Sequence, residues 1–246
     1  KKLIAASSAA VYGEGNQDVN LTEETKMNPI SPYGESKVMM EEIIRQWKSS
    51  YNFNYVILRF FNIYGIGQSS EYAGVITKCL EKIKQKKPIE IFGDGLQTRD
   101  FVAIEDVINA IYNAMQSSNS GTYNIASGKT ITINELVNKM ILLSRKKLEI
   151  KHIRAKKGEI RYSHADISKA KKEIGFSPKI NLDRIKELLE EMKKTHDAKR
   201  HDYASAEDIF ANFRTCEMGG IPAWKGVCVR LGDKFSRLMG FAKKEK

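Results

Sequence analysis

The stretch Ser31–Phe60, SPYGESKVMMEEIIRQWKSSYNFNYVILRF, predicts a helix followed by a buried strand. Ser31 is a favourable N-cap residue, and Pro32 suits the first helical position. Apolar residues then recur near helical spacing as far as Tyr51, whereas Tyr55–Phe60 forms a short, mainly apolar run that is typical of a buried strand. Helices that alternate with such strands indicate an α/β fold with a parallel sheet.

The same alternation continues on both sides of this stretch. Leu3–Ala6 predicts a buried strand that ends at Ser7 and Ser8, and a polar loop then extends to Ile30. Further strands are expected at Ile89–Phe92, Phe101–Ala103, Thr122–Ala126 and Lys151–Arg154, and further helices at Val75–Gln85, Glu105–Met115, Ile133–Leu143, Ile167–Ile174 and Leu182–Lys194. The whole pattern predicts a parallel α/β sheet.

Composition narrows the class of protein. The 246 residues are 41% hydrophobic and 29% charged, which suits a folded globular chain, and no apolar run approaches the ~20 residues of a membrane span. The net charge of +11 comes from lysines spread over many expected helices, so we expect no nucleic-acid partner, although a basic surface suits an anionic substrate. Three cysteines without a CxxC pair indicate free thiols in the cytoplasm, and the four histidines predict no metal site.

Tyr33 and Lys37 form a YxxxK pattern on the expected helix. Residues four apart share one helix face, and a neighbouring ammonium favours the phenolate form of a tyrosine, so such a pair can transfer protons. The pattern also occurs on ordinary helix faces. Its context distinguishes it, because Ser8 lies at the end of an expected strand and a polar loop of this length can bring that strand end beside the helix.

Five motifs follow one another in a fixed order. They are Ser7–Gly13, Tyr33–Lys37, Leu58–Gly65, Ile91–Val102 and Ala155–Arg161. With this order and spacing, residues 1–193 resemble the extended short-chain dehydrogenase/reductase family, within it the NAD-dependent epimerases and dehydratases similar to UDP-glucose 4-epimerase. The resemblance implies a partial Rossmann-like parallel sheet, the C-terminal part of that fold, with a small α/β substrate-binding domain, together forming residues 1–194.

The resemblance implies catalytic roles for three residues. Ser8 would hydrogen-bond the C4 hydroxyl of the sugar, Tyr33 would remove its proton, and Lys37 would hold the nicotinamide ribose and tune Tyr33. It also implies NAD as the cofactor, bound by Ser7, Tyr33, Lys37 and Phe60.

The resemblance further implies that a UDP-sugar is the substrate. The implied contacts are Asn62, Tyr72, Val75, Phe92, Arg99, Lys156 and Glu159. Arg99 and Asn62 would bind the diphosphate, although Asn62 could instead cap a turn and Arg99 could be a surface ion-pair partner. Tyr72 and Val75 could be ordinary packing at a helix start. Lys156 stands where the family has an arginine, and a lysine loses the two-pronged phosphate contact.

Two features depart from the family. No GxxGxxG or GxGxxG turn, the motif that binds the pyrophosphate of NAD, occurs in the chain, so we expect an incomplete fragment without the N-terminal half. Ala9 and Ala10 stand where dehydratases carry acidic residues, which favours UDP-glucose/UDP-galactose-type 4-epimerisation. A non-catalytic nucleotide-sugar-binding remnant and a 4,6-dehydratase or reductase relative remain alternatives.

Residues 195–246 do not continue the family pattern. They weakly resemble a truncated phage-type MazG-like domain through segments such as His201–Tyr203, and a helical appendage without chemistry is the alternative. We expect a boundary near residue 195 and a homodimer in the full-length family member, with the helices near residues 33–51 and 105–115 as candidate surfaces.

Overall fold

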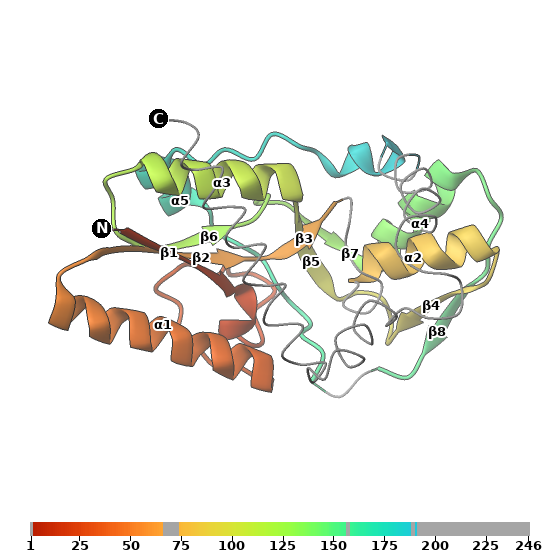
Figure 1. The fold of residues 1–246 in the computed structure, drawn as a ribbon. Helices are drawn as coiled ribbons and strands as arrows, with labels where there is room; N and C mark the ends of the chain where they lie inside the picture. Colours follow the sequence, from red (N-terminus) through yellow and green to blue (C-terminus); the bar gives the residue numbers. More distant parts are fainter. Residues whose placement is uncertain (1, 66–73, 156–157, 188–189, 191–246) are drawn as a thin grey trace, which may run out of the picture. The chain divides into compact units, whose positions relative to one another are not determined.

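The computed structural model describes residues 2–65, 74–155, 158–187 and 190, which belong to the compact unit Lys1–Met192. Its elements follow the alternation that the sequence predicts (Figure 1). They are β1 (Lys2–Ser8), the 3₁₀ turn η1 (Ala9–Val11), α1 (Pro32–Tyr51), β2 (Asn54–Phe60), β3 (Asn62–Tyr64), α2 (Val75–Gln85), β4 (Ile89–Phe92), β5 (Thr98–Ala103), α3 (Ile104–Gln116), β6 (Gly121–Ile125), β7 (Thr130–Thr132), α4 (Ile133–Ser144), β8 (Ile150–Ile153), α5 (Ser168–Ile174) and the 3₁₀ turn η2 (Leu182–Arg184).

The first region is a parallel sheet in the order β1-β2-β6, which confirms the predicted parallel arrangement. Helix α1 covers one face of this sheet and α3 covers the other (Figure 1). The register pairs Ser7 with Arg59 and Ser8 with Phe60, so the motif residues of both strands lie at the same carboxyl edge. In parallel α/β sheets, ligands bind outside this edge.

The second region contains the parallel pair β4–β8 and the sheet β3-β5-β7, with α2 and α4 packed together beside them. Its core includes Ile83, Ile91 and Met140, whereas the core of the first region includes Val56, Leu58 and Val107. The strands β5 and β7 are antiparallel, so the expected parallel pattern does not hold there. The reason is the turn at 126–129, after which the chain runs back along β5.

Several local expectations differ from the structure. The short strands β3 and β7 were not predicted, because three residues give no readable periodicity. The predicted first strand is present, but it is buried only in part: Ala5 is buried, whereas Leu3 is 41% exposed, and β1 has one neighbour, β2, within the described residues. The helix expected at Leu182–Lys194 begins with the 3₁₀ turn η2, and most of its second half lies outside the described residues. The boundary near 195 and the tail 195–246 also lie outside them.

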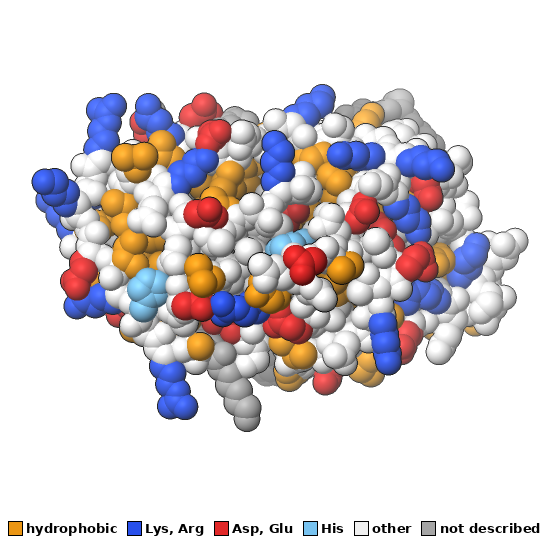
Figure 2. Space-filling model, turned by 180° about the vertical axis from the view of Figure 1, so that it is seen from behind, with side chains coloured by type: hydrophobic (Ala, Val, Ile, Leu, Met, Phe, Trp, Pro, Cys, Tyr) orange, Lys and Arg blue, Asp and Glu red, His pale blue; other side chains and the backbone are white. Residues whose placement is uncertain are grey.

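Charged side chains are dispersed over the face that Figure 2 shows, with Asp and Glu among the Lys and Arg side chains. This dispersion agrees with the expectation that the lysines are solvated on helix faces. Within the described part of the chain, no helix has the length and apolar character needed to cross a membrane.

Candidate active site

The carboxyl end of β1 meets the first turns of α1. Ser8 ends β1 and caps η1, where its Oγ accepts a hydrogen bond from Ala10 N at 3.2 Å. Lys37 reaches back to the strand, and its Nζ donates to Ala6 O at 2.9 Å. The same Nζ lies 5.6 Å from the centroid of the Tyr33 ring, which is 56% exposed. The structure therefore brings the three predicted catalytic residues to one edge of the sheet.

A glycine allows this close approach. A Cβ on Gly34 would lie 2.6 Å from Ala10 O, a distance that real Cβ atoms essentially never show. The helix begins at this point because Ser31 accepts from Gly34 N at 3.1 Å and Pro32 occupies the first position. The residue after Tyr33 thus packs directly against the turn that follows Ser8.

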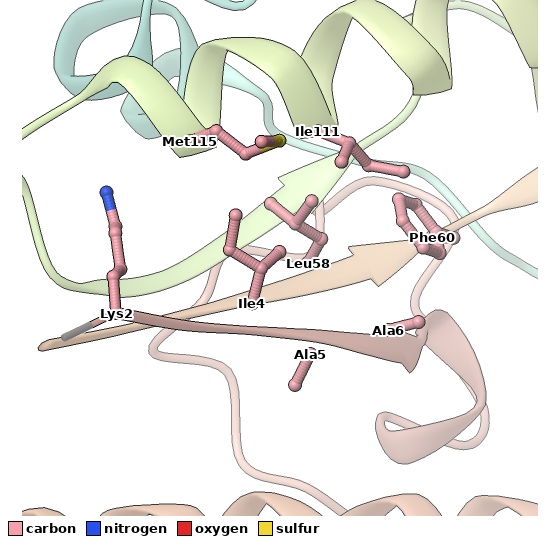
Figure 3. Close-up of a pocket in the computed structure, with 8 residues that line it drawn as sticks. All are labelled: Lys2, Ile4, Ala5, Ala6, Leu58, Phe60, Ile111 and Met115. Atoms are coloured by element: carbon pink, nitrogen blue, oxygen red, sulfur yellow. The ribbon is translucent and has the colours of Figure 1, made fainter. Parts of the chain in front are cut away.

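The other two predicted NAD contacts point to opposite faces of the sheet, as consecutive register positions must. Ser7 is buried on the α1 side, where its Oγ donates to Glu41 Oε1 at 2.5 Å. Phe60 lies on the α3 side and lines an apolar cavity of about 500 Å³ (Figure 3). The cavity is bounded by Lys2, Ile4, Ala5, Ala6, Leu58, Phe60, Ile111 and Met115.

The predicted diphosphate contacts lie on and beside β5. Asn62 Nδ2 donates to Asp100 O at 3.0 Å, so the amide ties β3 to β5. Arg99 Nη2 lies 3.9 Å from Glu159 Oε1, which also accepts from Gln97 Nε2 at 3.3 Å. The structure therefore brings Arg99 and Glu159 together, although their chain positions are far apart.

Burial lowers the pKa of the Arg99 guanidinium, and the charges of Glu159 and Glu14 partly oppose this effect. Arg99 Nη1 donates to Thr98 O at 2.8 Å, whereas Nη2 has the Glu159 carboxylate only at 3.9 Å, so this side of the planar fork is suited to a further anion such as a phosphate. This geometry favours a phosphate-binding role for Arg99. Its contact with Glu159 also agrees with the alternative, in which Arg99 is an ion-pair partner.

Two of the remaining predicted contacts lie at the ends of elements. Val75 is the first residue of α2 and Phe92 the last of β4. Both are partly buried, so helix-start packing remains an alternative for Val75. Tyr72 and Lys156 lie outside the described residues. Among the residues that the structure does describe, no group of His, Cys, Asp and Glu could hold a metal ion.

Glu14 is a structural residue that sequence reasoning missed. Its carboxylate accepts hydrogen bonds from Arg161 N at 2.8 and 2.9 Å and from Tyr162 N at 2.8 Å. The loop after β1 is thereby fastened to the segment that carries Glu159. No motif signals this role, because Glu14 makes its contacts to backbone groups 147 and 148 positions away.

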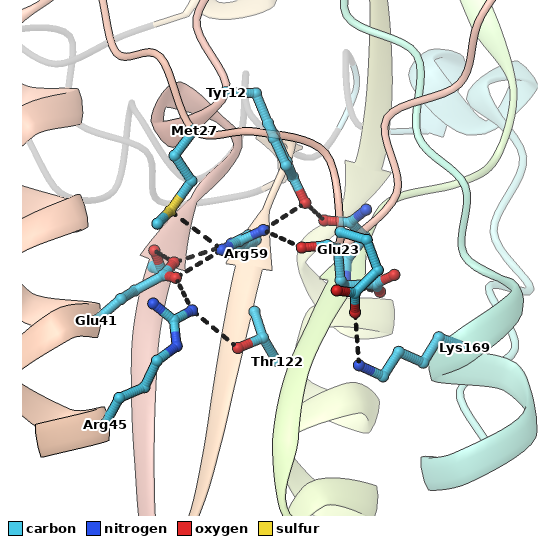
Figure 4. A network of polar contacts seen from close by, with 11 residues as sticks. Tyr12, Glu23, Met27, Glu41, Arg45, Arg59, Thr122 and Lys169 are labelled. Carbon is cyan, nitrogen blue, oxygen red and sulfur yellow. Dashed lines mark hydrogen bonds and ion pairs between the residues drawn. The ribbon is translucent and has the colours of Figure 1, made fainter.

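A buried polar network centred on Arg59 was also missed (Figure 4). Arg59, on the central strand β2, is 2% exposed and its Nη2 forms an ion pair with Glu41 at 2.7 Å. Its Nη1 donates to the hydroxyl of Tyr12 at 2.8 Å, and that hydroxyl donates to Asn124 Oδ1 at 2.6 Å. A signal did exist: an arginine within the apolar run 55–60 needs a partner if the strand is buried.

The network sets the charge states of its members. Burial alone would raise the pKa of Glu41, but hydrogen bonds from Arg59 and Ser7 and the charges of Arg59 and Arg45 outweigh it and place that pKa below its ordinary value. Burial raises the pKa of Tyr12 to about 12, in spite of Arg59. Glu41 is therefore a carboxylate and Tyr12 a neutral phenol near neutral pH.

Known proteins are similar to this chain in sequence and in fold. A family model described as GDP-mannose 4,6 dehydratase matches residues 1–192. The chain belongs to this family of NAD-dependent epimerases and dehydratases. A putative UDP-glucose 4-epimerase of Methanocaldococcus jannaschii is 38% identical over 199 residues, which are 80% of this chain and 64% of that protein.

Two solved structures of 4-epimerases are similar to this epimerase/dehydratase family member. The UDP-N-acetylglucosamine 4-epimerase of Methanobrevibacter ruminantium M1, in complex with UDP-N-acetylmuramic acid, is 35% identical with a TM-score of 0.74 and coverage of 81% and 64% of the two chains. The UDP-glucuronic acid 4-epimerase of Bacillus cereus, in complex with UDP-glucuronic acid and NAD, is 29% identical with a TM-score of 0.74 and coverage of 80% and 62%. The chain thus spans less than two thirds of each of these relatives.

Proposed function

We propose that this chain carries the catalytic and substrate-binding residues of an NAD-dependent 4-epimerase that acts on a UDP-sugar of the UDP-glucose/UDP-galactose type. The observation that carries the proposal is the meeting of Tyr33, Lys37 and Ser8 at the carboxyl edge of the sheet, with Gly34 against Ala10. An exposed tyrosine beside an ammonium at a ligand-binding edge is arranged for proton transfer.

The residues present fit the nicotinamide-ribose end of NAD. The Lys37 ammonium has three donors, one of which goes to Ala6 O, so two others can reach a ribose. Phe60 offers an apolar surface at the same edge. The sequence holds no glycine-rich turn for the pyrophosphate, and so the fit concerns that end alone. When bound, NAD supplies the acceptor and later donor of the C4 hydride.

The chain's own part in the reaction is proton transfer and orientation. Tyr33 takes the proton of the C4 hydroxyl as the carbonyl forms. It returns the proton after the sugar has rotated to present its other face. Ser8 Oγ holds the same oxygen, and its position is fixed by the cap to Ala10 N. Ala9 and Ala10 form the turn beside Ser8, and neither side chain can move a proton at a second carbon. This favours epimerisation over dehydration.

The substrate proposal rests on Arg99 and Glu159. Arg99 meets a diphosphate oxygen with its guanidinium, and Glu159, 3.9 Å away, accepts from a ribose hydroxyl. The similar 4-epimerases in complex with UDP derivatives support UDP as the nucleotide.

The experiment measures binding first and turnover second. Isothermal titration of the chain is expected to show UDP bound. Because the sequence holds no glycine-rich turn for the pyrophosphate, turnover is measured on the chain joined to an N-terminal segment with such a turn, and this joined protein is expected to bind NAD and to form UDP-galactose from UDP-glucose. Tyr33→Phe should lower turnover about 10²–10⁴-fold with UDP affinity unchanged. A 4-keto-6-deoxy product would overturn the choice of reaction, and a joined protein that binds UDP and NAD but converts no UDP-glucose would overturn the 4-epimerase proposal.

We also propose that a second copy of the chain packs against α1. Met39, Ile43, Trp47 and Tyr51 recur every fourth residue and are 62, 52, 58 and 68% exposed, so one face of the helix is apolar and open to solvent. Sedimentation equilibrium of the chain and of Trp47→Lys tests this, and a monomer for both would refute it.

A further inference from the structure

We propose that Glu41, held by Arg59, is the positioning residue that sets Tyr33 and Lys37 against Ser8; this inference rests on the proposed function of those three residues. Tyr33, Lys37, Glu41 and Arg45 recur every fourth residue of α1, so they line one face of the helix. The first two face the edge of the sheet. The next one, Glu41, is the point at which that face is fastened to the sheet.

A single carboxylate joins three elements here. Glu41 lies on α1 and is 0% exposed. Its Oε1 accepts from Ser7 Oγ on β1 at 2.5 Å and from Arg59 Nε on β2 at 3.0 Å, and its Oε2 accepts from Arg59 Nη2 at 2.7 Å. Two parallel bonds from a planar guanidinium fix direction as well as distance. The helix can therefore neither slide nor rotate without breaking them.

The opposite end of Arg59 holds the turn that carries Ser8. Arg59 Nη1 donates to the Tyr12 hydroxyl at 2.8 Å and to Glu23 O at 3.1 Å. Ser7 is thus bound to Glu41 and Tyr12 to Arg59, and the segment between them contains Ser8 and its cap. Figure 4 shows Arg59 between Glu41 on one side and Tyr12 on the other. The helix and the Ser8 turn share one anchor, so a shift of one moves the other.

Packing alone would not give this precision. An apolar side chain in place of Glu41 could bury the same helix face, since buried ion pairs are often no more stabilising than apolar packing. What the ion pair adds is orientation, and a misplacement of about 1 Å in a catalytic group costs about 10²-fold in rate. The network is therefore suited to aligning the helix with the Ser8 turn.

Glu41→Gln removes the charge of the anchor at a position that meets no ligand. Ser7→Ala removes the bond from β1 and leaves Glu41 with both arginines, and because Ser7 is also a predicted NAD contact, hydrogen exchange without ligands is the measurement that decides for this variant. Both are expected to lower the kcat for UDP-glucose about 10- to 100-fold with its KM unchanged within about twofold. Hydrogen exchange without ligands should become about tenfold faster at residues 9–12 and 34–37, and stay unchanged in α4.

Two matched variants serve as controls. Ser49→Ala replaces an exposed serine of the same helix that bonds to Gln46 O, and Glu42→Gln replaces an exposed carboxylate next to Glu41. Both should behave as the unchanged chain in every measurement. If Glu41→Gln does not fold, Ser7→Ala carries the test.

The outcomes distinguish the two proposals. If the joined protein with an unchanged chain converts no UDP-sugar, the proposed function fails, and hydrogen exchange alone decides the coupling of α1 to the Ser8 turn. If Ser7→Ala folds and shows the exchange rates of the unchanged chain in both segments, the positioning role of Glu41 is overturned. A rise in KM with unchanged kcat also overturns it, because lost orientation acts on the chemical step.

Discussion

Two fully buried carboxylates lie in different regions of the molecule, and they are held in different ways. Glu41, on α1 above the β1-β2-β6 sheet, faces the cations of Arg59 and Arg45 at 2.7 Å each. Asp100, on β5, accepts from Ser127 N at 2.7 Å, Ser127 Oγ at 2.6 Å and Gly128 N at 2.8 Å. Both residues are 0% exposed, and their hydrogen-bond partners differ: cations and a hydroxyl around Glu41, neutral groups around Asp100.

The difference sets the charge state of each region. For Glu41 the arginines and Ser7 outweigh burial and lower its pKa. For Asp100 burial dominates over neutral donors and raises its pKa to about 6. Neutral hydrogen-bond donors therefore do not compensate for a buried charge as fully as a cation does. Glu41 therefore keeps its negative charge near neutral pH, whereas Asp100 takes up a proton at about pH 6.

The largest expected effect follows from removing Arg59, the buried cation that pairs with Glu41. Arg59→Met leaves the Glu41 carboxylate buried with Arg45, whose side chain is 34% exposed, as its remaining cation. Breaking a buried pair from one side costs about 3–5 kcal/mol. We expect the free energy of unfolding in urea to fall by about that amount at pH 7.

An exposed arginine provides the control for this loss. Arg161 pairs with Asp94 at 2.8 Å, and the two side chains are 45% and 48% exposed. Arg161→Met should leave the free energy of unfolding nearly unchanged, since water screens such exposed pairs. Equal losses for the two variants would show that burial does not distinguish these ion pairs.

Much of the fold could be predicted because its elements are long enough to carry a period. The helices α1 and α2 and the strand β4 lie where the sequence places them, since capping by Ser31 and apolar spacing are local signals. The exposure of Leu3 and the reversal at β7 could not be predicted. Both depend on which strands become neighbours, and that is decided by packing over long chain distances.

The candidate site shows the same division. The YxxxK spacing and the end of the strand at Ser8 are local signals, so the sequence alone identifies both, with a loop between them that is long enough to bring the strand end beside the helix. The side-chain partners of Arg59 include Tyr12 and Glu41. The backbone N–H groups that donate to the Glu14 carboxylate belong to Arg161 and Tyr162. An arginine within an apolar run predicts that a partner exists, but a single sequence does not say which residue it is.

The next effect concerns the second region and its dependence on pH. The pKa of Asp100 is raised from 3.8 to about 6, so the folded chain binds a proton more readily than the unfolded chain between these values. The free energy of unfolding of the unchanged chain relative to Asp100→Asn should therefore fall by about 2–3 kcal/mol as pH rises from 4 to 7. Urea unfolding at several pH values measures this difference.

The pH range over which stability changes distinguishes the effect of Asp100 from that of Glu41. Because the pKa of Glu41 is lowered, its stabilisation is present above the ordinary 4.5 and is lost only as pH falls below it. That loss is common to both chains and cancels in the comparison. A control with Glu42→Gln, an exposed carboxylate, should give a curve parallel to that of the unchanged chain. A difference between the unchanged chain and Asp100→Asn that is flat from pH 4 to 7 would contradict the assignment.

The smallest expected effect compares helix starts in the two regions. Thr132 caps α4 in a reciprocal arrangement with Glu135, whereas Ser31 caps α1 through one bond to Gly34 N. Thr132→Ala and Ser31→Ala should each lower the free energy of unfolding by about 1 kcal/mol. Their effects on turnover should nevertheless differ, because Ser31 starts the helix that presents Tyr33 to Ser8, and α4 presents none of the three proposed catalytic residues. Equal turnover for both variants at equal stability would show that the start of α1 needs no cap to align the site, and that the anchor at Glu41 suffices.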